Sequence, residues 1–250
     1  MGKGWFAAAL VALFQGVGPV LAQQFEAPPP AIEEHLSGYL PDGKVDYRAI
    51  LPSPPKSGSI LDNLDVSTVT MLQTSASPRR WSSAERDSEY LYPRFNEAFG
   101  SAIDRTRAPK LVRLLNRTEH DVAAATFSAK RDFARLRPYQ RLPLRRVCGA
   151  PKPPRPDLRS TERSSYPSGH SAYGWAAALV LSRVAPEHEA QLLARAQDYE
   201  LSRVICGAHF PSDVEAGRML ATEVVARLEA DPGFEDDLTA AKAEHASLAK

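Results

Sequence analysis

Hydrophobic residues recur at helical spacing through most of the chain beyond residue 58. Apolar side chains at i, i+3 and i+4 indicate one buried face of an amphipathic helix, and prolines mark where such a face ends. No segment shows the alternation of apolar and polar residues that a strand of useful length needs. The pattern therefore predicts an all-α fold, a single-domain helical bundle. The expected helices cover residues 59–76, 83–99, 109–115, 118–136, 170–184, 186–206, 212–228 and 236–247.

Local sequence features set several of these helix ends. Pro93 is expected to kink or break the second helix, and Pro109 suits the first turn of the third. Pro138 disfavours helical geometry at the residue before it, so the helix over 118–136 should end at that point. Ser212-Asp213-Val214-Glu215 has the form of a capping box, which would fix the start of the helix over 212–228.

The first 58 residues do not follow the helical pattern. Lys3, an apolar stretch over 5–14 and a small-residue site ending at Ala22 stand in the order of a secretory signal peptide, with cleavage expected after Ala22. Residues 23–58 are rich in proline and glycine, and we expect an extended arm over the body with at most a short helix near 31–36. The chain thus divides into a signal peptide (1–22), a proline-rich arm (23–58) and a helical domain (59–250).

Composition and charge exclude two classes of partner. Hydrophobic residues make up 43% of the chain and charged residues 24%, as in an ordinary globular protein. Removing residues 1–22 takes one lysine from 31 basic residues and leaves 30 basic against 30 acidic ones. A neutral chain has no general attraction for nucleic acid or anionic membranes. The longest later apolar run, 172–181, is too short to span a bilayer, so the processed protein is expected to be soluble.

Two cysteines, Cys148 and Cys206, occur in the chain. In an exported protein an even count favours a disulfide, and two cysteines allow a single intramolecular pairing. The alternative is a pair of buried thiols. The bond would close a loop of 58 positions (206 minus 148).

Three short segments contain the groups needed to bind and attack a phosphate. In the first, Lys130 and Arg137 are seven residues or two helical turns apart, so both side chains are expected to leave the same face and could hold phosphate oxygens. Taken alone, such a pair is usually solvated surface. The arginine-rich stretch that continues from it is interrupted by prolines, and a solvated loop is the simpler interpretation than a nucleic-acid site. It comprises Arg135, Arg137, Arg141, Arg145 and Arg146.

The second segment, Pro167-Ser168-Gly169-His170, lies where a loop enters a helix. Ser168 can cap the helix, Gly169 allows a ligand to approach the backbone, and the amides of a first helical turn bind anions. His170 could donate a proton to a leaving oxygen. The alternative is a capped helix with an exposed histidine.

The third segment contains Arg203, His209 and Asp213. Asp213 stands four residues beyond His209, from where its carboxylate is expected to bond one ring nitrogen. The other nitrogen would then be unprotonated, as a base or nucleophile requires. Without the other segments, a structural hydrogen bond between the two would be an equal alternative.

The order and spacing of the three segments are similar to those of the type 2 phosphatidic acid phosphatase superfamily. The stretches RSSYPSGHS (163–171), GWAAALVL (174–181) and SRVICGAH (202–209) resemble the bacterial class A nonspecific acid phosphatases more closely still. The resemblance covers most of the mature chain. It implies a helical bundle of the acid phosphatase and vanadium haloperoxidase type, action in the periplasm and assembly into a homo-oligomer.

By this resemblance His209 is the nucleophile that takes the phosphoryl group, Asp213 orients it and His170 protonates the departing alcohol oxygen. The phosphate oxygens would be bound by Lys130, Arg137, Arg203 and the amides around Ser168 and Gly169. No cofactor or metal is expected, because three fixed cations can do the electrostatic work of a metal and no zinc-site spacing occurs. The expected substrates are small-molecule phosphomonoesters of a broad range, with transfer to another alcohol as a side activity.

Some features leave alternatives open. Ala208, Phe210 and Pro211 depart from the class A pattern beside the nucleophile, which puts the shape and preference of the pocket in doubt. A lipid-phosphate phosphatase, a vanadium-dependent haloperoxidase and a non-catalytic phosphate-binding protein are the rival interpretations. With an ordinary histidine pKa of about 6.5, His170 predicts activity that peaks on the acid side of neutral.

Overall fold

A computed structural model describes residues 36–41, 45–148 and 164–248. The predicted signal peptide, the first part of the arm and nearly all of the short helix expected near 31–36 lie outside these residues. Within them every regular element is a helix and no strand occurs, so the all-α prediction is confirmed for the described part of the chain. No helix in that part is both long and apolar enough to cross a bilayer.

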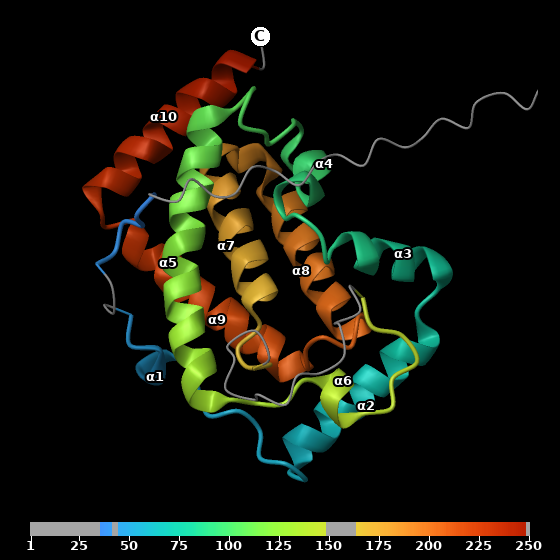
Figure 1. The fold of residues 1–250 in the computed structure, drawn as a ribbon. Helices are drawn as coiled ribbons and strands as arrows, with labels where there is room; N and C mark the ends of the chain where they lie inside the picture. The colour runs from blue at the N-terminus through green and yellow to red at the C-terminus, as the bar shows by residue number, and fades with distance from the viewer. Residues whose placement is uncertain (1–35, 42–44, 149–163, 249–250) are drawn as a thin grey trace, which may run out of the picture.

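Four long helices form the centre of the bundle (Figure 1). They are α5 (Pro109–Phe133), α7 (Gly169–Val184), α8 (Glu189–Ile205) and α9 (Pro211–Leu228). Most residues of α7 are buried around its whole circumference, as expected of a helix enclosed by others. Gly174 allows α8 to approach it closely, because a Cβ there would lie 2.7 Å from Cδ1 of Tyr199. The helix α10 (Pro232–Leu248) covers α5 on the outside.

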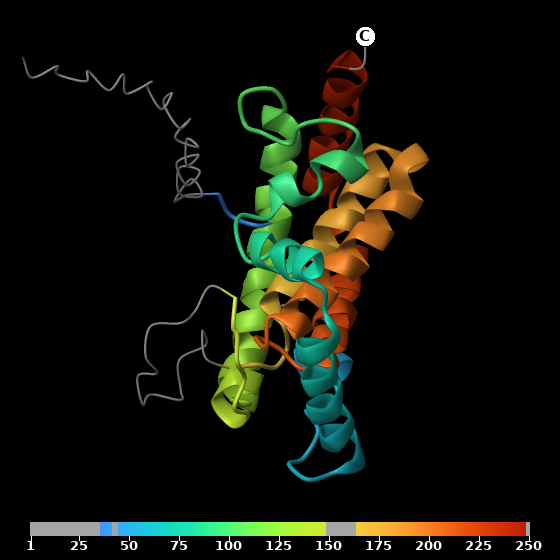
Figure 2. The same cartoon turned by 90° about the vertical axis from the view of Figure 1, so that its right-hand side faces the viewer.

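Smaller elements surround this centre. Figure 2 shows α3 (Pro78–Arg86) in front of the bundle and α2 (Ile60–Ser75) towards its lower end. The described part of the arm lies on the body of its own chain. There the Tyr39 amide donates to Asp121 at 2.7 Å and the Tyr166 hydroxyl donates to the Pro52 carbonyl at 2.7 Å. The arm contains one helical turn that was not predicted, α1 (Tyr47–Ile50).

The helix predicted over 83–99 is wrong in its extent. Helix α3 begins earlier, because Ser77 caps it and Pro78 occupies its first position. It ends at Arg86, and the chain continues through a 3₁₀ turn (Tyr92–Arg94) into the short helix α4 (Asn96–Phe99). The break therefore begins before Pro93. The predicted helices over 59–76, 170–184, 186–206, 212–228 and 236–247 correspond to α2, α7, α8, α9 and α10.

The two helices predicted over 109–115 and 118–136 form a single helix, α5. The polar residues near the expected break are accommodated inside it, since Thr118 bonds the Leu114 carbonyl and Asn116 accepts from Tyr92. The helix then ends at Phe133, earlier than predicted, because Ala134 adopts a left-handed conformation with φ of 43°. Arg137 consequently lies beyond the helix, at the start of α6 (Pro138–Arg141), and does not share a helix face with Lys130.

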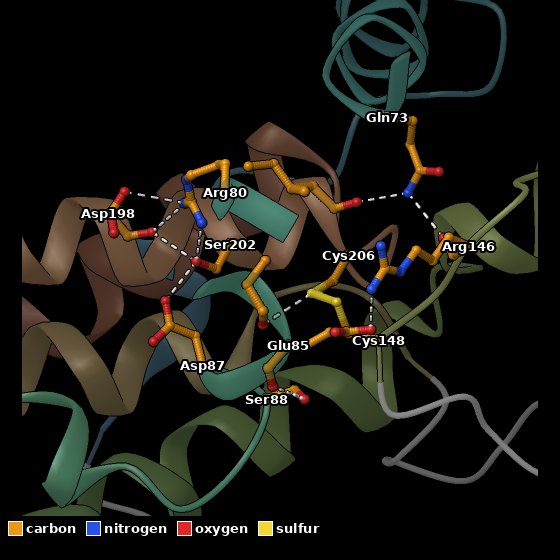
Figure 3. The surroundings of a disulfide bond; sticks show 12 residues. Gln73, Arg80, Glu85, Asp87, Ser88, Arg146, Cys148, Asp198, Ser202 and Cys206 are labelled. Atoms are coloured by element: carbon orange, nitrogen blue, oxygen red, sulfur yellow. Dashed lines mark hydrogen bonds and ion pairs between the residues drawn. A yellow bond between two sulfur atoms is a disulfide. The ribbon is translucent and has the colours of Figure 1, made fainter. Parts of the chain in front are cut away.

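The predicted disulfide is present between Cys148 and Cys206, with Cα atoms 4.9 Å apart. It joins the segment after α6 to the C-terminal end of α8, three residues before His209 (Figure 3). Gln73 of α2 lies on the same side and donates to the carbonyls of Ile205 (2.6 Å) and Arg146 (3.1 Å). The start of the His209 loop is therefore held covalently and by α2.

Replacing both cysteines by serine should lower the melting temperature by on the order of 10 °C. The reason is that a bond closing a loop of this length is worth roughly 4 kcal/mol in chain entropy. Differential scanning calorimetry of the double variant and the oxidised wild type measures the difference. An unchanged melting temperature would mean that the bond does not stabilise the fold.

Candidate active site

The three predicted segments meet at one end of the bundle. The C-terminal ends of α5 and α8 and the N-terminal ends of α7 and α9 all lie at the lower end in Figure 1. Because the N-terminal end of a helix carries partial positive charge and free amides, this end of the bundle favours an anion.

His209 lies in the tight connection between α8 and α9, which turns at Gly207 with a φ of 66°. Its ring is 1% exposed. Nδ1 lies 2.8 Å from the Ser165 carbonyl oxygen, and Nε2 lies 2.9 Å from Nη1 of Arg137. A carbonyl can accept only, so the hydrogen-bond network assigns the proton to Nδ1 and leaves Nε2 unprotonated, with its lone pair accepting from Nη1 of Arg137.

The predicted bond between Asp213 and His209 is wrong. The nearest carboxylate oxygen lies 3.8 Å from Nδ1, and that nitrogen donates to Ser165 instead. Asp213 is in the first turn of α9, with Phe210 and not Ser212 at the N-cap, and its Oδ2 accepts from the Phe210 amide at 2.7 Å. The same oxygen accepts from the Ser165 hydroxyl at 2.5 Å. The carboxylate thus reaches His209 as a nearby charge and through Ser165.

Three basic side chains surround this histidine. Lys130 is buried and donates to the Ser164 carbonyl at 2.5 Å, while Arg137 reaches His209 from the start of α6. Burial, together with the charge of Arg137, lowers the pKa of Lys130 well below its usual value. The pKa values of Arg137 and Arg203 are lowered by burial as well.

Arg203 is the clearest sign of an anion site. Its side chain is 5% exposed, and its Nε and Nη1 atoms donate to no acceptor among the described residues. A buried guanidinium with unused donors is costly, and two oxygens of a phosphate would satisfy them. The structure therefore brings the three predicted cations together. Lys130 and Arg137 meet because the chain turns at Ala134, and not because they share a helix face as predicted.

The second segment forms the start of α7. Ser168 caps the helix, and its Oγ accepts from the Ser171 amide at 3.3 Å and from the Ser171 hydroxyl at 2.9 Å. The amide of Ser168 donates to the Asp213 carbonyl at 2.8 Å, so it is engaged within the protein. The amides of Gly169 and His170, which belong to the first helical turn, have no acceptor within the helix. These two amides and the Ser168 hydroxyl could donate to a phosphate at this end of the helix.

His170 lies half-buried in the first turn of α7. The positive charge of Arg203, followed by burial and the neighbouring His209, lowers its pKa well below the usual value. The ordinary pKa assumed from the sequence is therefore wrong for the site without an anion. Burial and the charges of Arg137 and Lys130 lower the pKa of His209 in the same direction, which keeps its Nε2 unprotonated.

Sequence reasoning missed two residues of this site, Ser165 and Arg135. Ser165 acts through its backbone carbonyl, which no side-chain pattern reveals. Arg135 was assigned to a solvated loop, but it is 8% exposed and donates to Asp213 at 2.6 Å. The sequence did contain a signal for Arg135. Asp62 and Asp65 lie three residues apart on one face of α2, and two buried carboxylates need a basic partner, which is Arg135.

Comparison with known proteins agrees with this arrangement. Residues 121–228 match the PAP2 superfamily. The chain is 37% identical over 211 residues to a non-specific acid phosphatase of Providencia stuartii, covering 82% of this chain and 83% of that relative. The chain belongs to the class A nonspecific acid phosphatases of the PAP2 superfamily. A non-specific acid phosphatase of Salmonella typhimurium is 34% identical (82% of each chain), and an acid phosphatase of Zymomonas mobilis is 33% identical (78% of this chain, 73% of that relative).

Membership of these acid phosphatases makes the chain a phosphoric monoester hydrolase, as the sequence predicted. Two of the positions that depart from the class A pattern are buried in hydrophobic clusters, and the Ala208 carbonyl accepts from Nη1 of Arg137 at 3.1 Å. Ala208 packs beside Trp81 and the disulfide, and Phe210 is fully buried among valines of α2, α8 and α9. Pro211 is the first residue of α9. The departures at Ala208 and Phe210 thus alter the hydrophobic packing next to the His209 loop.

We expect bound orthophosphate to raise the pKa of His170. In the site without an anion, its pKa lies below the usual value, so the ring is neutral near pH 7 and becomes charged only at lower pH. A phosphate dianion offsets the positive charge of Arg203, so the charged ring should persist to higher pH. Proton NMR titration of the histidine ring between about pH 4 and 8, with and without orthophosphate, measures this shift, and His170→Asn assigns the signal. A pKa that orthophosphate leaves unchanged would contradict the electrostatic description of the site.

Proposed function

We propose that this acid phosphatase hydrolyses phosphomonoesters through a covalent phosphohistidine on His209, without a metal. The observation that carries the proposal is the 2.8 Å contact between Nδ1 of His209 and the Ser165 carbonyl, which supports a proton on Nδ1 and an unprotonated Nε2 able to attack. A two-step route through a covalent intermediate divides one difficult displacement into two easier ones.

In the first step the Nε2 lone pair attacks phosphorus and the bond to the ester oxygen breaks. The departing oxygen takes the proton of charged His170, so an alcohol leaves and His170 becomes neutral. In the second step neutral His170 accepts a proton from a water whose oxygen attacks phosphorus. The bond to Nε2 then breaks, and orthophosphate and the original histidine are restored. An alcohol in place of water would give transfer to that alcohol.

The charge that develops on the phosphoryl oxygens is matched by Lys130, Arg137 and Arg203 and by the amides at the start of α7. Fixed donors in a site with little water stabilise such charge without rearrangement, which is the work that a metal performs in many phosphatases. Among the described residues no group of three or more histidines, cysteines and carboxylates is arranged to hold a metal. The broad substrate range is supported by the relatives named non-specific.

Purified mature protein should hydrolyse p-nitrophenyl phosphate in the presence of a chelator, with an optimum below neutral pH. His209→Ala should lower kcat by at least about 10³-fold, because the attacking atom is lost. His120→Ala is the matched control, since His120 is an exposed histidine of α5 and should retain wild-type activity. Activity that the chelator abolishes, or that survives in His209→Ala, would exclude this mechanism.

Three additions to this assay separate the rival functions: a lipid phosphate as a second substrate, vanadate with halide, and a measurement of orthophosphate binding. A lipid-phosphate phosphatase would prefer a lipid phosphate over the soluble ester, and a haloperoxidase would require vanadate and halide for any turnover. A phosphate-binding protein would bind orthophosphate without turnover. The relatives named acid phosphatases favour hydrolysis of the soluble ester.

We also propose export to the periplasm and assembly into a homo-oligomer. Export is supported by the charged, apolar and cleavable order of residues 1–22. Assembly is supported by apolar side chains on α2 that are exposed in the single chain, Ile60, Leu61, Leu64 and Met71.

Protein recovered from the periplasm should begin at Gln23 and elute as more than one copy in size-exclusion chromatography with light scattering. Recovery of unprocessed protein in the cytoplasm, or of a monomer, would contradict the respective proposal.

A further inference from the structure

A buried ionic network lies directly behind the nucleophile loop. At its centre is Arg135, which follows the left-handed turn at Ala134 and is 8% exposed. Its Nη1 donates to Asp213 at 2.6 Å and to the Ser212 hydroxyl at 2.7 Å. Its Nη2 donates to Asp65 at 2.8 Å. One guanidinium therefore connects the first turn of α9 with α2.

The side of the network that faces α2 is equally well bonded. Asp65 accepts from the Ser212 amide at 3.0 Å and from the Ser212 hydroxyl at 2.5 Å. Asp62 accepts two bonds from Arg141, at 2.7 and 2.8 Å. The guanidiniums of Arg135 and Arg141 also lie over the Phe210 ring, at 4.4 and 5.0 Å from its centroid. The two arginines thus share Asp62 and Phe210 as neighbours, but among them only Arg135 bonds Asp213.

The side that faces His209 passes through Ser165. The hydroxyl of this serine donates to Asp213, while its carbonyl accepts from Nδ1 of His209. Its amide donates to the Arg135 carbonyl at 2.7 Å. Ser165 is fully buried and is fixed by three bonds, two of which end on Asp213 or Arg135. The position of the carbonyl that orients the nucleophile is therefore set by these two residues.

We propose that Arg135 is a positioning residue for the nucleophile, because it holds Asp213 and the Ser165 segment so that Nδ1 of His209 stays protonated and Nε2 stays directed at phosphorus. The proposal rests on the phosphohistidine mechanism proposed above. Arg135 itself touches neither His209 nor a phosphate in this arrangement. It acts through Asp213, whose carboxylate is completely buried and needs a counter-ion.

Electrostatics supports the same role. Burial by itself would lower the pKa of Arg135, but Asp213 and Asp65 outweigh it and raise the pKa, so the guanidinium is permanently charged. The charged Arg135 is the counter-ion of the Asp213 carboxylate at 2.6 Å, and this carboxylate, 3.8 Å from Nδ1, faces the positive ring that forms when Nε2 is phosphorylated. The loss of Arg135 should therefore slow the chemical step more than it weakens phosphate binding.

The test compares Arg135→Gln with Arg141→Gln. The second substitution removes an arginine of the same network that bonds Asp62 and makes no bond to Asp213. Three quantities are measured for each variant and for the wild type: kcat with p-nitrophenyl phosphate, the inhibition constant of orthovanadate, and the downfield NMR signal of the His209 Nδ1 proton. For Arg135→Gln we expect kcat to fall by about 10- to 100-fold, as for the partners that orient metal-bound histidines. The orthovanadate constant should change by less than about threefold, since Lys130, Arg137 and Arg203 remain, and the Nδ1 signal should shift or broaden.

Arg141→Gln should keep wild-type kcat and the wild-type Nδ1 signal. Arg135→Lys should recover part of the lost kcat, because a lysine restores the charge but not the fork of donors. Equal losses in the two glutamine variants, or a loss of kcat matched by weaker orthovanadate inhibition, would reduce Arg135 to a structural role and overturn the proposal.

Ser165→Ala tests the same connection should Arg135→Gln fail to fold. It removes the bond to Asp213 and retains the carbonyl, so kcat should fall while orthovanadate inhibition remains; wild-type kcat in this variant would overturn the proposal. The NMR signal separates this inference from the catalytic mechanism. An inactive wild-type protein would refute the proposed mechanism, whereas an Nδ1 signal unchanged in Arg135→Gln would refute the positioning role even with an active enzyme.

Discussion

Lys130, Arg137 and Arg203 are held close together in a part of the protein from which water is largely excluded, and the fold must withstand their mutual repulsion. Burial lowers the pKa of all three side chains, and the charge of Arg137 lowers the pKa of Lys130 and of Arg203 further. Asp213 offsets part of this charge, and Arg203 has donors that no described residue uses. A phosphate would complete this arrangement, because it would supply negative charge and acceptors for the donors of Arg203.

The surrounding structure is organised to hold these charges in place. Each cation is delivered by a different element: Lys130 by the last turns of α5, Arg137 by the start of α6 and Arg203 by the last turn of α8. The disulfide at Cys206 and the bond from Gln73 secure the loop that begins at the end of α8. Helix α2 contributes no group to the phosphate site, yet its Asp62 and Asp65 anchor the arginines behind the nucleophile. The site thus lies on helix ends that are joined to one another by the disulfide and by these bonds.

Much of this could be predicted from the sequence. Helices α7, α8 and α9 have strong apolar patterns, and the groups of the site lie at their ends, so both the elements and the candidate residues were accessible. The disulfide followed from a count of two cysteines in a chain that was expected to be exported. Helix α5 was predicted as two helices because Asn116 and Thr118 interrupt its apolar face. A tertiary bond from Tyr92 to Asn116 and a bond from Thr118 to the Leu114 carbonyl within the helix allow these polar residues inside it.

The remaining features depend on tertiary geometry that the sequence does not reveal. A left-handed alanine at position 134 is rare, and it redirects the chain so that Arg137 meets His209 while Arg135 turns inward. The sequence spacing between His209 and Asp213 suggested a direct bond, whereas the N-terminal turn of α9 draws the carboxylate to the Phe210 amide. The His209 ring is oriented by the Ser165 carbonyl, a backbone group that is present at every residue.

The central claim is that Nε2 of His209, and not Nδ1, attacks phosphorus. The most direct measurement is 31P NMR of the enzyme quenched in alkali during turnover, because the two nitrogen-linked isomers of phosphohistidine give distinct signals. The account predicts a single phosphohistidine, on residue 209, with the phosphoryl group on Nε2. Phosphate found on Nδ1, or on any other residue, would contradict it.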